Sequence, residues 1–431
     1  MELLQLSSWP WLYLVVGFQT VVYVFETYLD LRQLQALKRP SLPPQLKGIV
    51  SAEKFEKSKA YQLDKSYFGL LHSAVGQIEQ TAILLFGVLP WLWLRSGDIL
   101  REYGYKPEEH EILQSLLFLA IQFVWSQVTD LPWSIYSTFV IEQVHGFNKQ
   151  TPALFVKDLV KGYALTAIIA PPIIAGIITI VKVGGPYLAV YLWAFLLVLS
   201  LVMMVLYPLV IAPLFNTYTT LPEGTLRTEI EKLAASLSYP LKKLFVVNGS
   251  IRSGHSNAYL YGFFKNKRIV LYDTLLEQCK KDEEVVAVIG HELGHWKLNH
   301  TVYTFLAQQV IWLVYMGGFQ AIKGSKVLYQ SFGFDSEAVL IGLLLFGFVI
   351  GPVSHTLSFV FNIVSRTFEY QADAFAVHLG YAEPLKVGLI RLQEENLSAM
   401  NLDPWYSTYH FSHPPLIDRL GAINSQSKKR L

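Results

Sequence analysis

The residues best suited to chemistry lie in segment 286–296, which contains the pattern His-Glu-x-x-His. His291 and His295 are four residues apart, so a helix here would present both imidazoles on one face. The apolar run before them lacks proline and follows Asp282, which can cap a helix. Two imidazoles at this spacing are typical metal ligands, and Glu292 beside them is placed as the general base of a metalloprotease.

A four-residue pattern of this kind also arises by chance, and alone it does not separate a metal site from an ordinary helix. Gly294 lies inside the pattern. A glycine in a helix interior costs about 1 kcal/mol relative to alanine, so its presence requires a packing reason. The metal interpretation therefore needs a third ligand from elsewhere in the chain.

Segment 365–373 supplies that ligand. Two histidines on one helix form a His₂Glu zinc site when another helix adds a carboxylate and the fourth position stays open. We expect Glu369 to begin a helix just after the last apolar span and to be this ligand. Asp373, one turn later, would accept the outer N–H of a ligand imidazole. The alternative is a solvated acidic helix end.

A third cluster, at residues 409–420, places histidines beside two prolines. His413 precedes Pro414 and Pro415, which would hold it rigidly, so its imidazole suits stabilisation of a developing oxyanion. His410 is the less favoured choice for this role. The alternative is a surface loop that leads into a terminal amphipathic helix.

The composition indicates a membrane protein. Of 431 residues, 52% are hydrophobic and 16% are charged, and several segments are long enough to cross a bilayer. The net charge of +2 excludes the basic footprint of a nucleic-acid-binding protein. The one cysteine, Cys279, excludes an internal disulfide and is expected to be an inert free thiol. Seven spans are expected, at residues 9–28, 67–94, 112–128, 163–181, 187–211, 301–322 and 339–361.

The basic residues predict the orientation of these spans. The first connection carries eight Lys and Arg residues, whereas the second has three among more acids and the fourth only Lys182. The first connection and the C-terminus are therefore expected in the cytosol, and the N-terminus on the other side. Glu26 and Glu79 fall inside spans, where a carboxylate is costly in lipid, so both should face protein or water.

Segment 214–300 is expected to form a small cytosolic insertion. Pro222 would open a helix, and strand-like runs follow at 244–247, 257–263 and 268–272, the last two joined as a hairpin. An exposed strand edge near the metal would bind an extended peptide; the alternative is a purely structural hairpin. The chain then divides into transmembrane helices 1–5 (1–213), the protease insertion (214–300), transmembrane helices 6–7 (301–364) and the third-ligand helix with the C-terminal cytosolic region (365–431).

These motifs and spans resemble the type I CAAX prenyl protease family. The segments that carry the resemblance are 291–295, 369–373 and 413–415, with further matches at 145–151 and 255–263. The resemblance covers nearly the whole chain. It implies an all-α polytopic zinc metalloprotease of the endoplasmic reticulum membrane, whose seven transmembrane helices enclose a large chamber, with a small α+β, thermolysin-like insertion.

The resemblance also implies a reaction and its partners. The substrates would be prenylated CAAX proteins, from which an enzyme with one Zn²⁺ per chain, embedded in the lipid bilayer, removes the last three residues. Asn257, Ala258 and Tyr259 resemble the edge strand with which thermolysin-like peptidases hold their substrate. The C-terminal segment 428–431 resembles a dilysine retrieval signal, and the alternative is a solvated basic tail.

Three other classes of protein share some of these features. A membrane quality-control metalloprotease would share the zinc motifs but have fewer spans and no prenyl preference. An intramembrane site-2-type protease would supply an aspartate as third ligand, and the charged segment 280–284 does not suit a helix inside the membrane. A seven-helix transporter or receptor would contain no stoichiometric metal, so zinc content separates it from the proteases.

Overall fold

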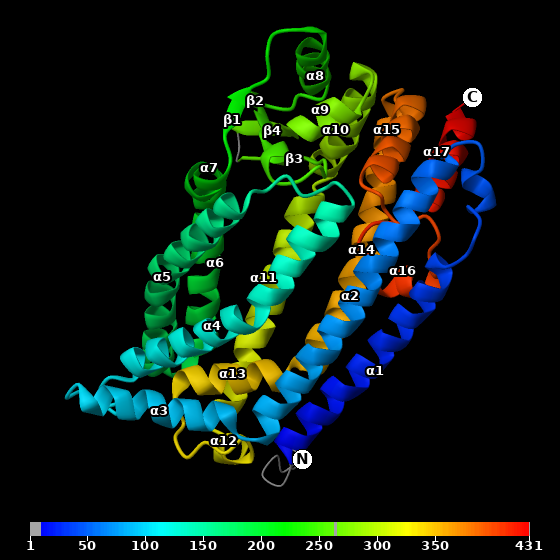
Figure 1. Ribbon diagram of the computed structural model, residues 1–431. Coiled ribbons are helices and arrows are strands. Elements are labelled where there is room, and N and C mark those ends of the chain that lie inside the picture. The colour runs from blue at the N-terminus through cyan, green and yellow to red at the C-terminus, as the bar shows by residue number, and fades with distance from the viewer. Residues whose placement is uncertain (1–9, 263–264, 431) are drawn as a thin grey trace.

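The protein consists mainly of long helices, seen in a computed structural model that describes residues 10–262 and 265–430 (Figure 1). Within these residues, five helices are long and apolar enough to cross a membrane, or up to seven spans if each of two bent helix pairs counts as one. The unbent spans are α1 (Trp11–Leu37), α4 (Glu111–Tyr136) with a π-helical extension (Ser137–Glu142), α5 (Pro152–Val183), α6 (Leu188–Leu206) extended through α7 (Ala212–Phe215), and α11 (His300–Ile322).

The two bent pairs correct the expectation of uninterrupted spans at 67–94 and 339–361. The first pair, α2 (Ala52–Leu85) and α3 (Val88–Glu102), bends by 63°, and the second, α13 (Val339–Val349) and α14 (Gly351–His378), bends by 58°. At the first bend Gly87 adopts a left-handed conformation with φ of 64°. At the second, Pro352 follows Gly351 in the first turn of α14, where its missing N–H ends the preceding helix.

Glu369 does not begin a helix, contrary to expectation. It lies well inside α14, which runs without interruption from the membrane-spanning region toward the sheet-containing end of the molecule (Figure 1). The sequence between Pro352 and Gly380 contains neither glycine nor proline, so nothing stops the helix after the apolar span. One continuous helix therefore connects the membrane-spanning region to Glu369, the expected third ligand.

The insertion holds a four-stranded sheet in the order β1-β2-β4-β3. The central pair β2–β4 is parallel and the two outer pairs are antiparallel, so β3 is an edge strand. β1 was not expected, and α8 begins at Thr225 rather than Pro222 because Gly224 remains extended. The elements are β1 (Tyr218–Thr220), α8 (Thr225–Ser236), β2 (Leu241–Val247), β3 (Ala258–Tyr261), β4 (Lys267–Tyr272), α9 (Asp273–Gln278) and α10 (Asp282–Lys297). Residues 263 and 264 of the expected hairpin lie outside the described residues.

Helix α10 is buried on several faces. Ile289 and Leu293 pack with α8 and the sheet, whereas Ala287 packs with Val377 of α14 and Leu385 of the following helix. Burying several aliphatic side chains on one helix contributes about 1.5–3 kcal/mol for each. This packing fixes α10 between the sheet and the C-terminal helices, which are α15 (Ala382–Glu395), α16 (Pro404–His410) and α17 (Leu416–Arg430).

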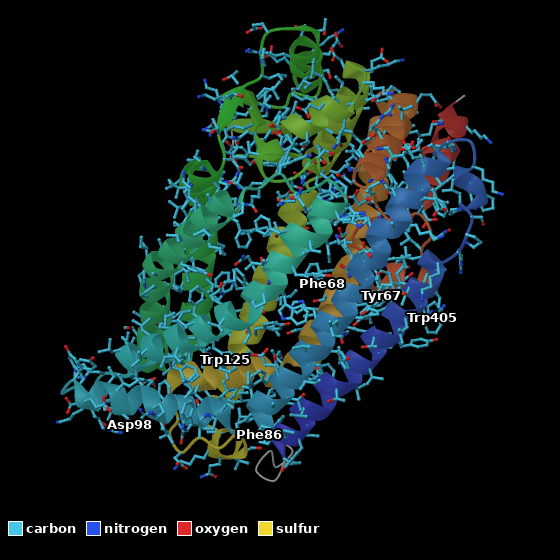
Figure 2. The ribbon with its side chains drawn as sticks, in the orientation of Figure 1. Tyr67, Phe68, Phe86, Asp98, Trp125 and Trp405 are labelled. Carbon is cyan, nitrogen blue, oxygen red and sulfur yellow. The ribbon has the colours of Figure 1, made fainter. Side chains whose placement is uncertain are left out.

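The spanning helices leave apolar side chains on the surface. In the most apolar window of the α6 span, no residue is buried by the protein itself. The bend residue Phe86 is also exposed (Figure 2).

The acidic residues inside the spans have protein partners, as expected. Glu79 accepts a hydrogen bond of 2.7 Å from Trp125, and Glu26 accepts one of 3.1 Å from Tyr409. The start of α1 and the end of α17 lie at opposite ends of the molecule, and the short helix α12 (Lys326–Ser331) lies near the start of α1 (Figure 1).

Candidate metal centre

The site forms where α10 and α14 approach each other closely. A Cβ added to Gly294 would lie 3.2 Å from the Cα of Ala372 and 3.1 Å from the ring of Phe375, so only glycine leaves room for this approach. This close contact explains why a glycine stands at position 294, in the interior of a helix. It brings the two histidines of α10 within reach of Glu369 on α14.

His291, His295 and Glu369 converge on one point. Each offers one ligand atom, and the three atoms lie within 4.8 Å of one another. The two Nε2 atoms are 3.2 Å apart, and the oxygens of Glu369 lie 3.4 Å from His291 and 3.3 Å from His295. The three ligands expected from two distant motifs are thus side by side.

The donor atoms fit a cation. Oε2 of Glu369 is buried and accepts no hydrogen bond among the described residues, although Nη1 of Arg419 lies 3.6 Å from it. A buried carboxylate oxygen without a hydrogen bond is costly. His291 and Glu369 are only 6% and 5% exposed, so water cannot satisfy them freely. A divalent ion at the common point would compensate both the facing ring nitrogens and this oxygen.

Asp373 lies next to the imidazole of His291, as expected from the sequence. Its Oδ1 is 2.9 Å from Nδ1 of His291, which leaves Nε2 facing the common point. Arg419 of α17 donates two hydrogen bonds to the same carboxylate, at 2.6 and 2.8 Å. Sequence reasoning gave Arg419 no role. The only signal for Arg419 in the sequence was its place in the 409–420 cluster. Its contact with Asp373 could not be predicted, because no spacing rule relates residues of α17 to residues of α14.

A second relay, also missed, orients His295. Nδ1 of His300 is 3.0 Å from Nδ1 of His295, and Nε2 of His300 is 2.9 Å from Oε1 of Gln371. Because the amide oxygen of Gln371 accepts from His300, Nδ1 of His300 accepts from His295. His295 therefore carries its proton on Nδ1 and presents a free lone pair on Nε2. The ring of His300 stacks on Phe368 with centroids 4.1 Å apart, which fixes its orientation.

The centre opens into a cavity of about 200 Å³ lined by Glu292, Asn257, Ala258 and His413. Nε2 of the largely exposed His413 is 3.4 Å from Oε1 of Glu369. Tyr259 is not among the lining residues, and its hydroxyl lies 3.2 Å from that of Tyr218. Asn257 and Ala258 stand at the start of edge strand β3, so an unpaired strand edge adjoins the centre.

Burial and charge shift the acid–base groups of α10. Burial raises the pKa of Glu292 above its ordinary value, so this carboxyl holds a proton more readily than a solvated one. Burial alone would lower the pKa of His291, but its hydrogen bonds to Asp373 and Glu369 outweigh it and raise the pKa to about 9. A carboxyl with a raised pKa is suited to take up and release protons.

Comparisons with known proteins cover almost the whole chain. A model described as "CAAX prenyl protease N-terminal, five membrane helices" matches residues 33–217, and "Peptidase family M48" matches residues 220–427. A CAAX prenyl protease 1 homolog of Arabidopsis thaliana is 61% identical over 420 residues, covering 97% of this chain and 99% of the relative. The human CAAX prenyl protease 1 homolog is 45% identical, covering 96% and 95% respectively.

A solved structure agrees with these sequence matches. The crystal structure of S. mikatae Ste24p superposes with a TM-score of 0.91 at 36% identity, covering 97% of this chain and 100% of that one. The predicted fold class, a helical polytopic membrane protein with a small sheet in its peptidase part, is confirmed.

Proposed function

Because the chain belongs to peptidase family M48 and carries the N-terminal membrane helices of CAAX prenyl proteases, we propose that it removes the last three residues of prenylated CAAX proteins. It is a membrane-embedded metalloprotease. The observation that carries the proposal is the convergence of His291, His295 and Glu369 in a chain that matches relatives named for CAAX processing over nearly its full length.

Zinc is the proposed metal, with one ion per chain held by His291, His295 and Glu369. Two imidazole nitrogens and one carboxylate oxygen with an open fourth position are the ligand set of catalytic zinc. When bound, zinc polarises a carbonyl and lowers the pKa of water toward neutral. Asp373, held by Arg419, and His300, held by Gln371, keep the two rings in the required tautomers.

The remaining roles belong to side chains around the cavity. Glu292 takes the proton of the attacking water and delivers it to the leaving amine. His413 donates a hydrogen bond to the oxygen of the scissile carbonyl as negative charge develops there. The edge of β3, at Asn257, Ala258 and Tyr259, holds the peptide in an extended conformation through its backbone.

The proposed location is the endoplasmic reticulum membrane, with the N-terminus in the lumen and the metal centre in the cytosol. The excess of Lys and Arg in the first connection supports this orientation. The C-terminal segment 428–431 carries two lysines, as a retrieval signal would.

Cleavage of a prenylated C-terminal peptide by the purified protein tests the proposal. We expect release of the terminal tripeptide, loss of this activity with a chelator, and much weaker cleavage of the unprenylated peptide. A membrane quality-control protease, the alternative function, would cleave the unprenylated peptide equally well. That result would refute prenyl-dependent processing while leaving the metalloprotease assignment intact.

A further inference from the structure

A second cavity, of about 480 Å³, adjoins the metal centre on the far side of His413. His413 and Asn396 line both cavities, so the two are neighbours. One part of its wall is formed by Tyr61, Gln62 and Lys65 of α2, together with His255. The volume lies in the range of cavities that enclose small ligands.

The side chains that line this second cavity include a cation but no carboxylate, and the nearby Glu142, which contacts Tyr61 and His255, interacts electrostatically with Lys65 without pairing with it. Besides Lys65, three histidines line the cavity. Within the described part of the chain, Lys65 has no carboxylate within 4.0 Å; its Nζ lies 3.4 Å from the hydroxyl of Tyr61. The ammonium group is therefore available to an anion that enters the cavity.

Contacts between distant segments hold the wall in place. Gln62 donates a hydrogen bond of 2.8 Å to the carbonyl of Leu397, at the end of α15. Tyr61 donates one of 2.5 Å to Glu142. His255 stacks on Phe147 with centroids 4.0 Å apart, and its Nδ1 lies 3.2 Å from Oδ1 of Asn396. These groups are positioned before any ligand arrives, which reduces the cost of binding one.

The position of β3 relates this cavity to the peptide. β3 begins at Ala258, and His255 lies just before it in the wall of the second cavity. A peptide that pairs antiparallel with the free edge of β3 runs toward His255, so its C-terminus points into the second cavity. Three extended residues beyond the scissile bond span about 10 Å. Because the two cavities share His413 and Asn396, a few residues beyond the scissile bond lead the peptide end toward the cavity that Lys65 lines.

We infer that the second cavity binds the free α-carboxylate of the peptide substrate, with Lys65 as its charge partner. This inference rests on the proposed function and specifies the substrate further, as a chain end rather than an internal segment. When Lys65 binds the terminal carboxylate, its position beyond the metal centre determines how many residues lie between the scissile bond and the end of the peptide. It thereby favours release of a short C-terminal fragment.

Paired substrates test the inference, using the full-length protein in detergent. One prenylated peptide ends in a free carboxylate, and an otherwise identical peptide ends in an amide. We expect kcat/KM of the wild type to be about tenfold higher for the carboxylate. Lys65→Met should lower kcat/KM for the carboxylate peptide about tenfold and leave the amide peptide within twofold, whereas Lys65→Arg should retain the preference.

Lys57→Met is the matched control, because Lys57 lies on the same helix but pairs with Glu53 at the surface. It should keep the tenfold preference. Equal cleavage of both peptides by the wild type would overturn the inference, and so would an equal loss on both peptides in Lys65→Met. Cleavage of neither peptide by the wild type would instead contradict the proposed function, and the inference with it.

Discussion

At the scale of single residues, the proposed chemistry depends on one carboxylate outside the proposed set of metal ligands. Glu292 lines the cavity of the metal centre beside the two histidines but is not one of the three converging groups. We expect Glu292→Gln to retain one metal ion per chain and to lose about 10³-fold in kcat, since general-base catalysis contributes about 10²–10⁴-fold. Metal analysis and steady-state kinetics on the same preparation check this. Full activity in the variant would refute the base assignment.

Arg419 is expected to act through Asp373 rather than on the substrate. Its side chain is only 12% exposed and donates two hydrogen bonds to that carboxylate. Arg419→Gln would leave Asp373 poorly compensated, and metal affinity should fall by about 10–100-fold, as for other partners of ligand histidines. Competition with a chelator measures this. Arg227→Gln, which removes two surface ion pairs, is the control and should leave affinity unchanged.

Cys279 provides a residue-scale test of packing. The thiol is buried, and burial raises its pKa to about 11, so it stays neutral at pH 8 in the folded protein. A thiol with a raised pKa stabilises the fold below its unfolded pKa, and this contribution is lost as pH rises through the folded value. We expect alkylation by iodoacetamide at pH 8 to be at least tenfold slower in the native than in the denatured protein. Equal rates would show that Cys279 is accessible.

At the scale of elements, the closest approach of α10 and α14 determines whether the ligands meet. Gly294→Ala would place a Cβ 3.2 Å from the Cα of Ala372, so one helix must shift. We expect lower metal occupancy and a loss of about 1–3 kcal/mol in stability, the usual cost of overpacking. Thermal unfolding and metal content measure both effects. Gly421→Ala is the control, because nothing lies within 4 Å of its added Cβ and alanine favours a helix.

The elements also show what a local sequence pattern can predict. Spacing along one helix placed His291 and His295 correctly, because a four-residue separation has the same geometry in every α-helix. The bend at Gly87 escaped prediction because hydropathy continues across it, and only its left-handed backbone marks the break. Glu369 was expected at a helix start because the apolar run ends there, yet a helix continues wherever its residues tolerate the conformation.

At the scale of the whole molecule, contacts between remote segments position the site. Arg32 of α1 donates hydrogen bonds of 3.1 and 2.9 Å to Asp403, which caps α16, although 371 residues separate them. The ring of Trp405, which is labelled in Figure 2, also packs against this guanidinium, with its centroid 4.7 Å away. The loop that carries His413 follows α16, so its place depends on the first membrane helix. From the sequence, Arg32 could be interpreted only as one of the positive charges of the first connection. Its pairing with Asp403 could not be predicted, because contacts between remote segments follow no periodic spacing.

The central claim is that His291, His295 and Glu369 hold one divalent ion between α10 and α14. Anomalous diffraction above the zinc absorption edge, on crystals of the purified protein, tests it most directly. We predict one strong peak per chain within coordination distance of both Nε2 atoms and the Glu369 carboxylate, absent from a His291→Ala, His295→Ala, Glu369→Ala triple variant. A peak elsewhere, or stoichiometric zinc retained by the triple variant, would contradict the account.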